Sequence, residues 1–197
     1  MTDYLQSKIT TELQNLKTAQ ELLPIWTDNW GVEDFGLSIH SLGVTFLTLL
    51  GNHLGYVGVA EVPALSQGNY AHVGDNVRSD VVWFDKISHS PFLIAEFERY
   101  SKINDQPKLQ SKVKNLLLAQ HRWYETSEIL LLAYWRKKLI SSPEKSSLQQ
   151  IINRGFETQA KERVKGSMKG QLLLLEFVME KNSNHLLYLS DIILRVN

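Results

Sequence analysis

The chain has 197 residues, of which 43% are hydrophobic, and its 21 basic and 21 acidic residues give a formal net charge of zero. A chain of this length and apolar content can bury the core of one domain, so we expect a single domain over residues 1–197. The absence of cysteine excludes thiol catalysis, cysteine–zinc sites and disulfide scaffolds. No secretory signal is visible, and no run approaches the roughly 20 apolar residues of a membrane span. We therefore expect a cytoplasmic protein with no membrane partner.

The N-terminal part of the sequence predicts two helices joined by an aromatic loop. Apolar residues recur at helical spacing over residues 3–23, which predicts an amphipathic helix that ends near Pro24. The segment 25–36 is expected to be a loop or short helix that buries its aromatic side chains, Trp26, Trp30 and Phe35. Residues 38–54 predict a buried helix.

Three strands are predicted next. Residues 56–62 are rich in β-forming residues and end at Pro63. The apolar runs 81–84 and 92–97 flank a turn signal, so they predict a hairpin.

The rest of the chain continues the sheet. Asn104, Asp105 and Pro107 form a helix start signal, and residues 128–134 predict a strand after that helix. A further helix with capping-box character is expected from Ser141, followed by a closing hairpin of residues 172–179 and 186–196. The predicted fold is therefore α/β: a mixed central sheet whose core, about residues 38–135, runs helix, three strands, helix, strand. A C-terminal extension, residues 141–197, supplies a helix and a hairpin.

An acidic pattern marks two neighbouring strands of this core. Glu96 and Glu98 are two residues apart on one strand, so their side chains share a face. Asp80 begins the preceding strand, and antiparallel pairing can bring its carboxylate beside Glu96. Oxygen ligands of this kind suit Mg²⁺ or Mn²⁺.

The segments Arg78–Trp83 and Ala95–Glu98 together resemble the signature of the PD-(D/E)XK, or restriction-endonuclease-like, nucleases. In that family an Asp opens one core strand and an acid-x-Lys triplet lies on the next. The resemblance covers roughly residues 38–135 and implies the same αβββαβ element order. Two residues depart from the signature: Ser79 replaces the proline, and Glu98 replaces the lysine. Some members carry an acid at the latter position, and Lys112 or Lys108 from the following helix are alternative sources of the lysine.

The resemblance implies metal-assisted hydrolysis of phosphodiester bonds. Asp80 and Glu96 would bind Mg²⁺ or Mn²⁺, with the Phe97 backbone carbonyl and Glu61 as further ligands. Glu98, or a lysine such as Lys112, would orient or deprotonate the attacking water.

Basic residues follow the acidic strand, and the resemblance gives them a role in holding a nucleic-acid backbone, expected to be DNA. The candidates are Arg99, Lys102, Lys108 and Lys114. The alternative is that these charges form an ordinary solvated helix face.

Other interpretations stay open at this stage. Asp80, Glu96 and Glu98 can instead be strand-end acids in surface ion pairs, and the six scattered histidines have no metal-ligand spacing. The chain can be a catalytically inactive nuclease-fold protein that serves as a binding or assembly module, or an unrelated binding domain. A homodimer is a further option that the sequence leaves open.

Overall fold

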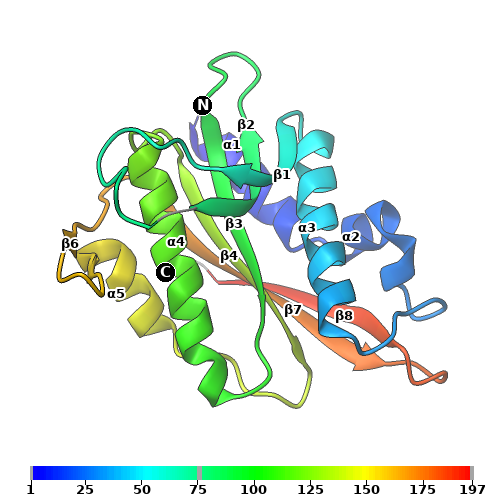
Figure 1. Cartoon of the computed structure of the whole chain (residues 1–197). Helices are drawn as coiled ribbons and strands as arrows, with labels where there is room; N and C mark the ends of the chain where they lie inside the picture. Colours follow the sequence, from blue (N-terminus) through cyan, green and yellow to red (C-terminus); the bar gives the residue numbers. More distant parts are fainter. Residues whose placement is uncertain (1, 75–76, 196–197) are drawn as a thin grey trace.

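The fold is built on one central sheet. A computed structural model describes residues 2–74 and 77–195 of the chain, and its six-stranded sheet has the order β1-β2-β3-β4-β7-β8 (Figure 1). The strands are β1 (Val57–Pro63), β2 (Arg78–Phe84), β3 (Pro91–Arg99), β4 (Ile129–Lys137), β7 (Gln171–Lys181) and β8 (Leu187–Arg195). Strand β4 runs parallel to both β3 and β7, and the other neighbouring strands are antiparallel. The sheet is therefore mixed, and β1 and β8 form its edges.

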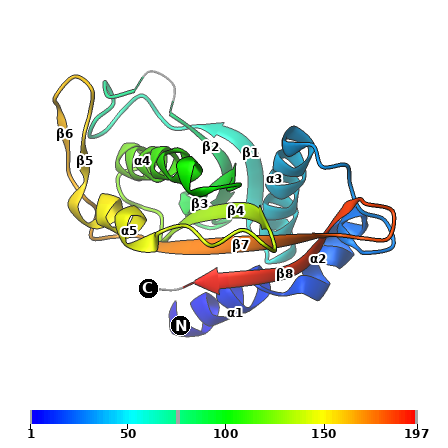
Figure 2. The ribbon, with the colours of Figure 1, turned by 90° about the horizontal axis from the view of Figure 1, so that it is seen from below.

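Helices cover both faces of the sheet. One hydrophobic core joins the sheet to α1 (Thr2–Leu13), α2 (Leu16–Leu22) and α3 (Gly36–His53). A second core joins the opposite face to α4 (Gln106–Arg122) and α5 (Lys145–Arg154). Figure 2 shows α4 and α5 on one side of β7, and α1 and α2 on the other. Short 3₁₀ helices span Pro24–Trp26 and Ile103–Asp105, and a small separate hairpin consists of β5 (Phe156–Glu157) and β6 (Arg163–Val164).

The central strands are apolar on both faces because both faces are covered. On β3, Ala95 and Phe97 face the α3 core, whereas Ile94 belongs to the α4 core. Alternating side chains of β4 and β7 divide between the two cores in the same way. This double burial explains why these strands read as continuous apolar runs rather than alternating ones.

Helix α3 packs directly on β2 and β3. A Cβ atom at Gly43 would lie 2.2 Å from the Phe97 ring, so only glycine permits this contact. The Trp83 indole donates a hydrogen bond to the Leu47 carbonyl at 2.8 Å, which fixes the same helix on β2. These two contacts hold α3 close to β2 and β3.

The predicted order of helix, three strands, helix and strand is confirmed by α3, β1, β2, β3, α4 and β4. The β2–β3 hairpin and the closing β7–β8 hairpin are also confirmed, and the latter extends the central sheet.

The N-terminal prediction was wrong in two respects. Instead of one helix over residues 3–23 there are two, because the Asn15 side chain accepts a hydrogen bond from the Thr18 N–H and starts α2 afresh. Only Trp26 of the aromatic loop is buried, since Trp30 and Phe35 are each 58% exposed.

Two C-terminal details also differ. Helix α5 begins at Lys145 and its N-cap residue, Glu144, makes no side-chain capping bond, so the capping box is wrong. The β5–β6 hairpin was not predicted, because each strand is only two residues long.

Of the helices in the described part of the chain, none has the length and apolar character needed to cross a membrane.

Candidate functional site

Three carboxylates from adjacent strands come together at the start of β2. The pairs Ala60–Val81 and Val62–Ser79 place Glu61 of β1 opposite Asp80 of β2. The pair Val81–Ala95 then places Glu96 of β3 on the other side of Asp80. Because like charges opposite one another destabilise a sheet, this row requires compensating cations.

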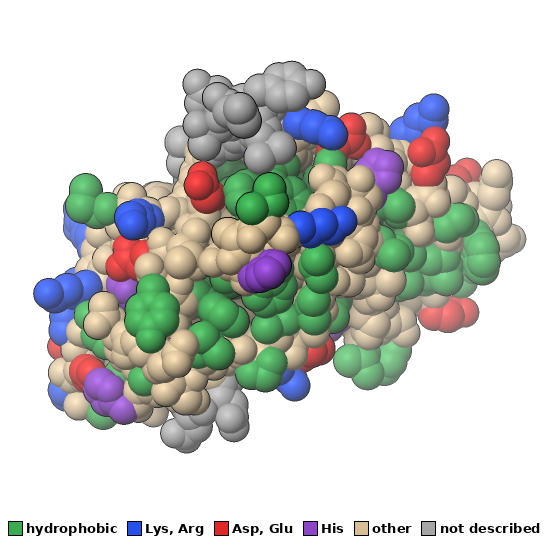
Figure 3. All heavy atoms as spheres, turned by 90° about the horizontal axis from the view of Figure 1, so that it is seen from above, with side chains coloured by type: hydrophobic (Ala, Val, Ile, Leu, Met, Phe, Trp, Pro, Cys, Tyr) green, Lys and Arg blue, Asp and Glu red, His purple; other side chains and the backbone are tan. Residues whose placement is uncertain are grey.

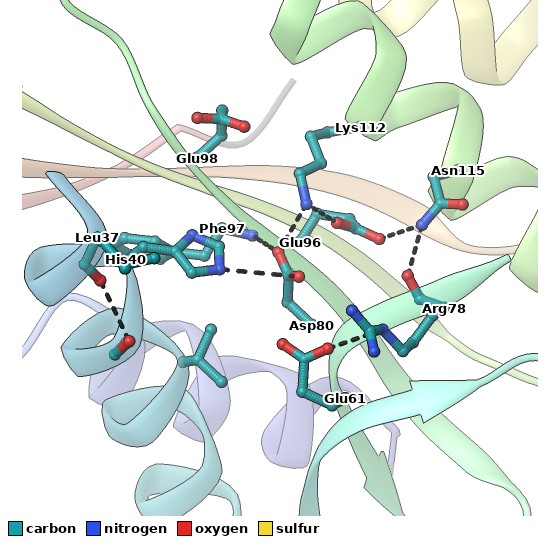
Figure 4. Close-up of polar contacts among 12 residues, drawn as sticks. Leu37, His40, Glu61, Arg78, Asp80, Glu96, Phe97, Glu98, Lys112 and Asn115 are labelled. Atoms are coloured by element: carbon teal, nitrogen blue, oxygen red, sulfur yellow. Dashed lines mark hydrogen bonds and ion pairs between the residues drawn. The ribbon is translucent and has the colours of Figure 1, made fainter. Parts of the chain in front are cut away.

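Lys112 of α4 supplies one such cation (Figure 4). Its ammonium nitrogen lies 2.6 Å from Oε2 of Glu96 and 3.0 Å from Oδ2 of Asp80. The two carboxylates therefore share one amine, and the Lys112 side chain keeps 25% of its surface exposed.

Asn115, one helical turn after Lys112, holds the other oxygen of Glu96. Its side-chain amide donates to Oε1 of Glu96 and also to the Arg78 carbonyl, the latter at 2.8 Å. Both oxygens of the Glu96 carboxylate thus accept hydrogen bonds from α4, and Glu96 is 0% exposed. These two donors fix the orientation of the Glu96 carboxylate.

The electrostatics of this cluster are strongly perturbed. Burial and the neighbouring Asp80 carboxylate raise the pKa of Glu96 to about 8, although Lys112 and Asn115 oppose the shift. Burial acts to lower the pKa of Lys112, but the carboxylates of Glu96 and Asp80 outweigh it and raise that pKa. Lys112 therefore stays protonated throughout the physiological range.

Asp80 is oriented by the backbone of β3. The Phe97 N–H donates to Oδ2 of Asp80 at 2.8 Å, so the Phe97 backbone enters the site through this donor. The other oxygen, Oδ1, lies 4.0 Å from Nε2 of His40, which projects from α3. Asp80 consequently stands between α4 on one side and α3 on the other.

A group of potential metal ligands lies on the α3 side of Asp80. One potential ligand atom each from His40, Glu61 and Asp80 lies within 4.8 Å of the others. Glu61 also forms an ion pair with Arg78, whose Nε lies 2.8 Å from Oε2 of Glu61. The backbone of Glu61 has a left-handed φ of 56°. Such a conformation is costly for a residue other than glycine, and it occurs here in the middle of an edge strand beside the acidic row.

Glu98 does not join the cluster, contrary to the prediction that three acids would surround one point. Its Oε1 accepts a hydrogen bond from the adjacent Arg99 N–H at 2.7 Å. In Figure 4 it lies apart from Lys112 and Asp80. Glu98 lies two residues after Glu96 on the same strand, as predicted, but its side chain bends toward the backbone N–H of Arg99.

The predicted DNA-contacting residues are dispersed. The Arg99 guanidinium lies 4.9 Å from the centre of the Trp135 ring, and Lys108 pairs with Asp105 at 3.0 Å. Lys102 is exposed after the end of β3, and Lys114 lies 5.3 Å from the centre of the Phe156 ring. Of these four, only Lys114 lines the same cleft as Asp80 and Lys112.

Sequence reasoning missed His40 and Asn115. Asn115 carries a signal, since it follows Lys112 by three residues and so shares its helix face. His40 carries none, because its proximity to Asp80 depends on the close approach of α3 at Gly43.

Charges of both signs are interspersed on the face seen from above in Figure 3, with no block of one sign. This mixture agrees with the zero net charge of the chain. No protein-family model, curated protein or solved structure matches this chain.

Proposed function

We propose that this protein is a divalent-metal-dependent nuclease that hydrolyses phosphodiester bonds in DNA, with a restriction-endonuclease-like core and a site of the PD-(D/E)XK type. The observation that carries the proposal is the position of Lys112, whose ammonium group contacts both Asp80 and Glu96. An acid pair with a lysine is the chemistry that the PD-(D/E)XK signature supplies, although here the lysine comes from α4 rather than from position 98.

The arrangement of elements supports the same proposal. Three antiparallel strands follow α3, and α4 then crosses over to β4, which lies parallel to β3. Asp80 and Glu96 lie on β2 and β3, the two middle strands of this unit, and Glu61 lies on its edge strand, β1.

The residues present fit a divalent cation. Burial raises the pKa of Glu96, and the Asp80 carboxylate beside it raises that pKa further; a second positive charge at this point would relieve the repulsion between the two carboxylates. His40, Glu61 and Asp80 offer ligand atoms within 4.8 Å of one another, and with Glu96 on the strand beside Asp80 they would hold Mg²⁺ or Mn²⁺. A bound metal of this kind lowers the pKa of its water and neutralises charge on the phosphate.

The protein groups have distinct tasks in this proposal. Lys112 stays protonated, so it stabilises negative charge on the attacked phosphate and does not act as a base. Asn115 fixes the rotation of Glu96, and the Phe97 N–H fixes that of Asp80. Glu98 has no direct part, because its carboxylate is turned toward Arg99.

The test is hydrolysis of labelled single-stranded and double-stranded DNA with Mg²⁺, with Mn²⁺ and with EDTA. We expect metal-dependent cleavage by the wild type and none by Asp80→Asn or Glu96→Gln, both of which conserve side-chain volume. Glu12→Gln, on the distant helix α1, is the matched control and should cleave normally. Metal-independent cleavage, or full activity in Asp80→Asn, would refute the proposal.

The second candidate function is a binding module that has lost its chemistry. The observation that favours it is Glu98, an acid at the signature's lysine position that contributes nothing to the cluster. A wild type that cleaves no substrate with either metal, and in which Glu98→Lys is equally silent, would support this candidate.

A further inference from the structure

A cleft on the α4 side of Asp80 leads away from the candidate site. It has a volume of about 450 Å³, and its lining includes Arg78, Asp80, Lys112, Lys114, Asn115 and Phe156. We call it the α4 cleft. Asp80 and Lys112 belong to the acidic cluster, whereas Lys114 and Phe156 have no place in the proposed reaction.

Two segments border this cleft, since Gly74 and Phe156 both line it. Residues 64–74, which follow β1, and the β5–β6 hairpin lie on the same side of the sheet as α4 (Figure 2). They are tied together, because His72 lies 2.8 Å from Glu162 and the Lys165 N–H donates to the Tyr70 hydroxyl at 3.1 Å. These two contacts connect the hairpin that carries Phe156 to the segment that carries Tyr70 and His72.

Lys114 is the cation in the α4 cleft that has no acidic partner. Arg78 pairs with Glu61, and Lys112 pairs with Asp80 and Glu96. Within residues 2–74 and 77–195, no carboxylate lies within ion-pair distance of Lys114, whose ammonium group instead lies 5.3 Å from the centre of the Phe156 ring. A lysine without a carboxylate partner beside an aromatic ring is suited to a phosphate with an attached base.

The size of the α4 cleft distinguishes between forms of DNA. Its volume falls in the range of small-molecule pockets, roughly 300–1,000 Å³. A nucleotide of a flexible strand can enter a space of this size, whereas the stacked bases of a duplex are not available to an aromatic ring inside it.

We propose that the α4 cleft binds single-stranded DNA, with a phosphate at Lys114 and a base against Phe156, beside the scissile phosphate at Lys112. The inference rests on the proposed nuclease function and specifies its substrate. It predicts that an unpaired strand, and not a duplex, is the preferred substrate.

The test measures binding separately from cleavage. Fluorescence anisotropy in EDTA, at a fixed low salt concentration, follows a labelled oligothymidylate either alone or annealed to oligoadenylate. We expect the single strand to bind at least about tenfold more tightly than the duplex. Phe156→Leu should weaken single-strand binding about tenfold, in keeping with the loss of one stacked base, and Phe156→Tyr should restore it.

Lys114→Gln provides an independent variant that does not disturb the apolar packing of Phe156. It should weaken single-strand binding and lower the slope of log affinity against log salt by about 0.7, the value for one phosphate contact on a single strand. The matched controls lie elsewhere: Tyr124→Leu, an exposed aromatic residue after the C-terminus of α4, and Lys17→Gln on α2. Both should bind like the wild type.

The outcomes separate this inference from the proposed function. The single-strand inference is overturned if the duplex binds equally or more tightly, or if Phe156→Leu and Lys114→Gln both bind like the wild type. The nuclease proposal is then decided separately, by the cleavage assay. Single-strand binding that depends on both residues, without cleavage in either metal, supports the α4 cleft as a DNA site and refutes the nuclease.

Discussion

The Nζ atom of Lys112 lies 2.6 Å from Oε2 of Glu96, although the lysine projects from a helix and the acid from a buried strand. The helix therefore delivers the positive charge that the strand itself lacks at position 98.

Lys112 should be essential for the rate of hydrolysis. Removing its charge with Lys112→Gln should lower kcat about 10²–10³-fold, which is the usual effect of removing one electrostatic stabiliser of a transition state. Lys108→Gln, four residues earlier on the same helix and paired with Asp105, is the matched control and should keep wild-type kcat. Equal losses in the two variants, measured by steady-state kinetics, would show that general helix charge matters and not the Lys112 position.

Glu98 should be dispensable. Among the residues that the structure describes, the Glu98 carboxylate accepts a hydrogen bond only from the Arg99 N–H, so Glu98→Gln should change kcat/KM by less than about threefold, or about 0.7 kcal/mol. The amide oxygen of glutamine can accept the same hydrogen bond, so folding should be unaffected. A loss comparable to that of Asp80→Asn would mean that Glu98 rotates into the site during the reaction.

Glu96 should make the metal-free protein less stable as the pH rises. Below about pH 4.5 the folded and unfolded states both hold its proton, but between about 4.5 and about 8 only the folded state does, so each rise in pH costs stability. Glu96→Gln lacks this dependence, so its Tm should rise relative to that of the wild type as the pH rises toward 8. The gain should shrink toward pH 5. Thermal melts in EDTA at both pH values test this, and a gain independent of pH would assign the effect to packing.

His40 should influence which metal binds. An imidazole nitrogen favours Mn²⁺ over Mg²⁺ relative to an all-oxygen site, so His40→Ala should weaken Mn²⁺ binding about tenfold and Mg²⁺ binding much less. His53→Ala, an exposed histidine in the last turn of the same helix, controls for the loss of an imidazole from α3. Titration calorimetry with each metal gives the comparison, and an unchanged Mn²⁺ affinity in His40→Ala would exclude His40 as a ligand.

Much of the fold could be predicted because apolar patterns report local structure directly. The two-residue period that puts Glu96 and Glu98 on one face of a strand is a property of any β-strand, and the β2–β3 turn brought Asp80 to the same place. Both could be read without knowledge of packing.

The remaining details depend on contacts between distant segments. Lys112 and Lys108 were equal candidates in the sequence, and only the rotation of α4 on the sheet selects Lys112. His40 reaches Asp80 because α3 sits against Phe97 at Gly43. The two-residue strand period gives the face on which Glu98 lies, but it does not determine the side-chain rotamer, which here directs the carboxylate to the Arg99 N–H.

The left-handed backbone of Glu61 also affects how the molecule behaves in concentrated solution. Strand β1 is an edge, and an edge with regular free N–H and C=O groups is a template on which another chain can add a strand. Glu61 interrupts that regularity in the middle of β1 and places a charged pair with Arg78 beside the interruption. Glu61, whose left-handed backbone lies beside the acidic row, thus makes the β1 edge a poor surface for edge-to-edge aggregation.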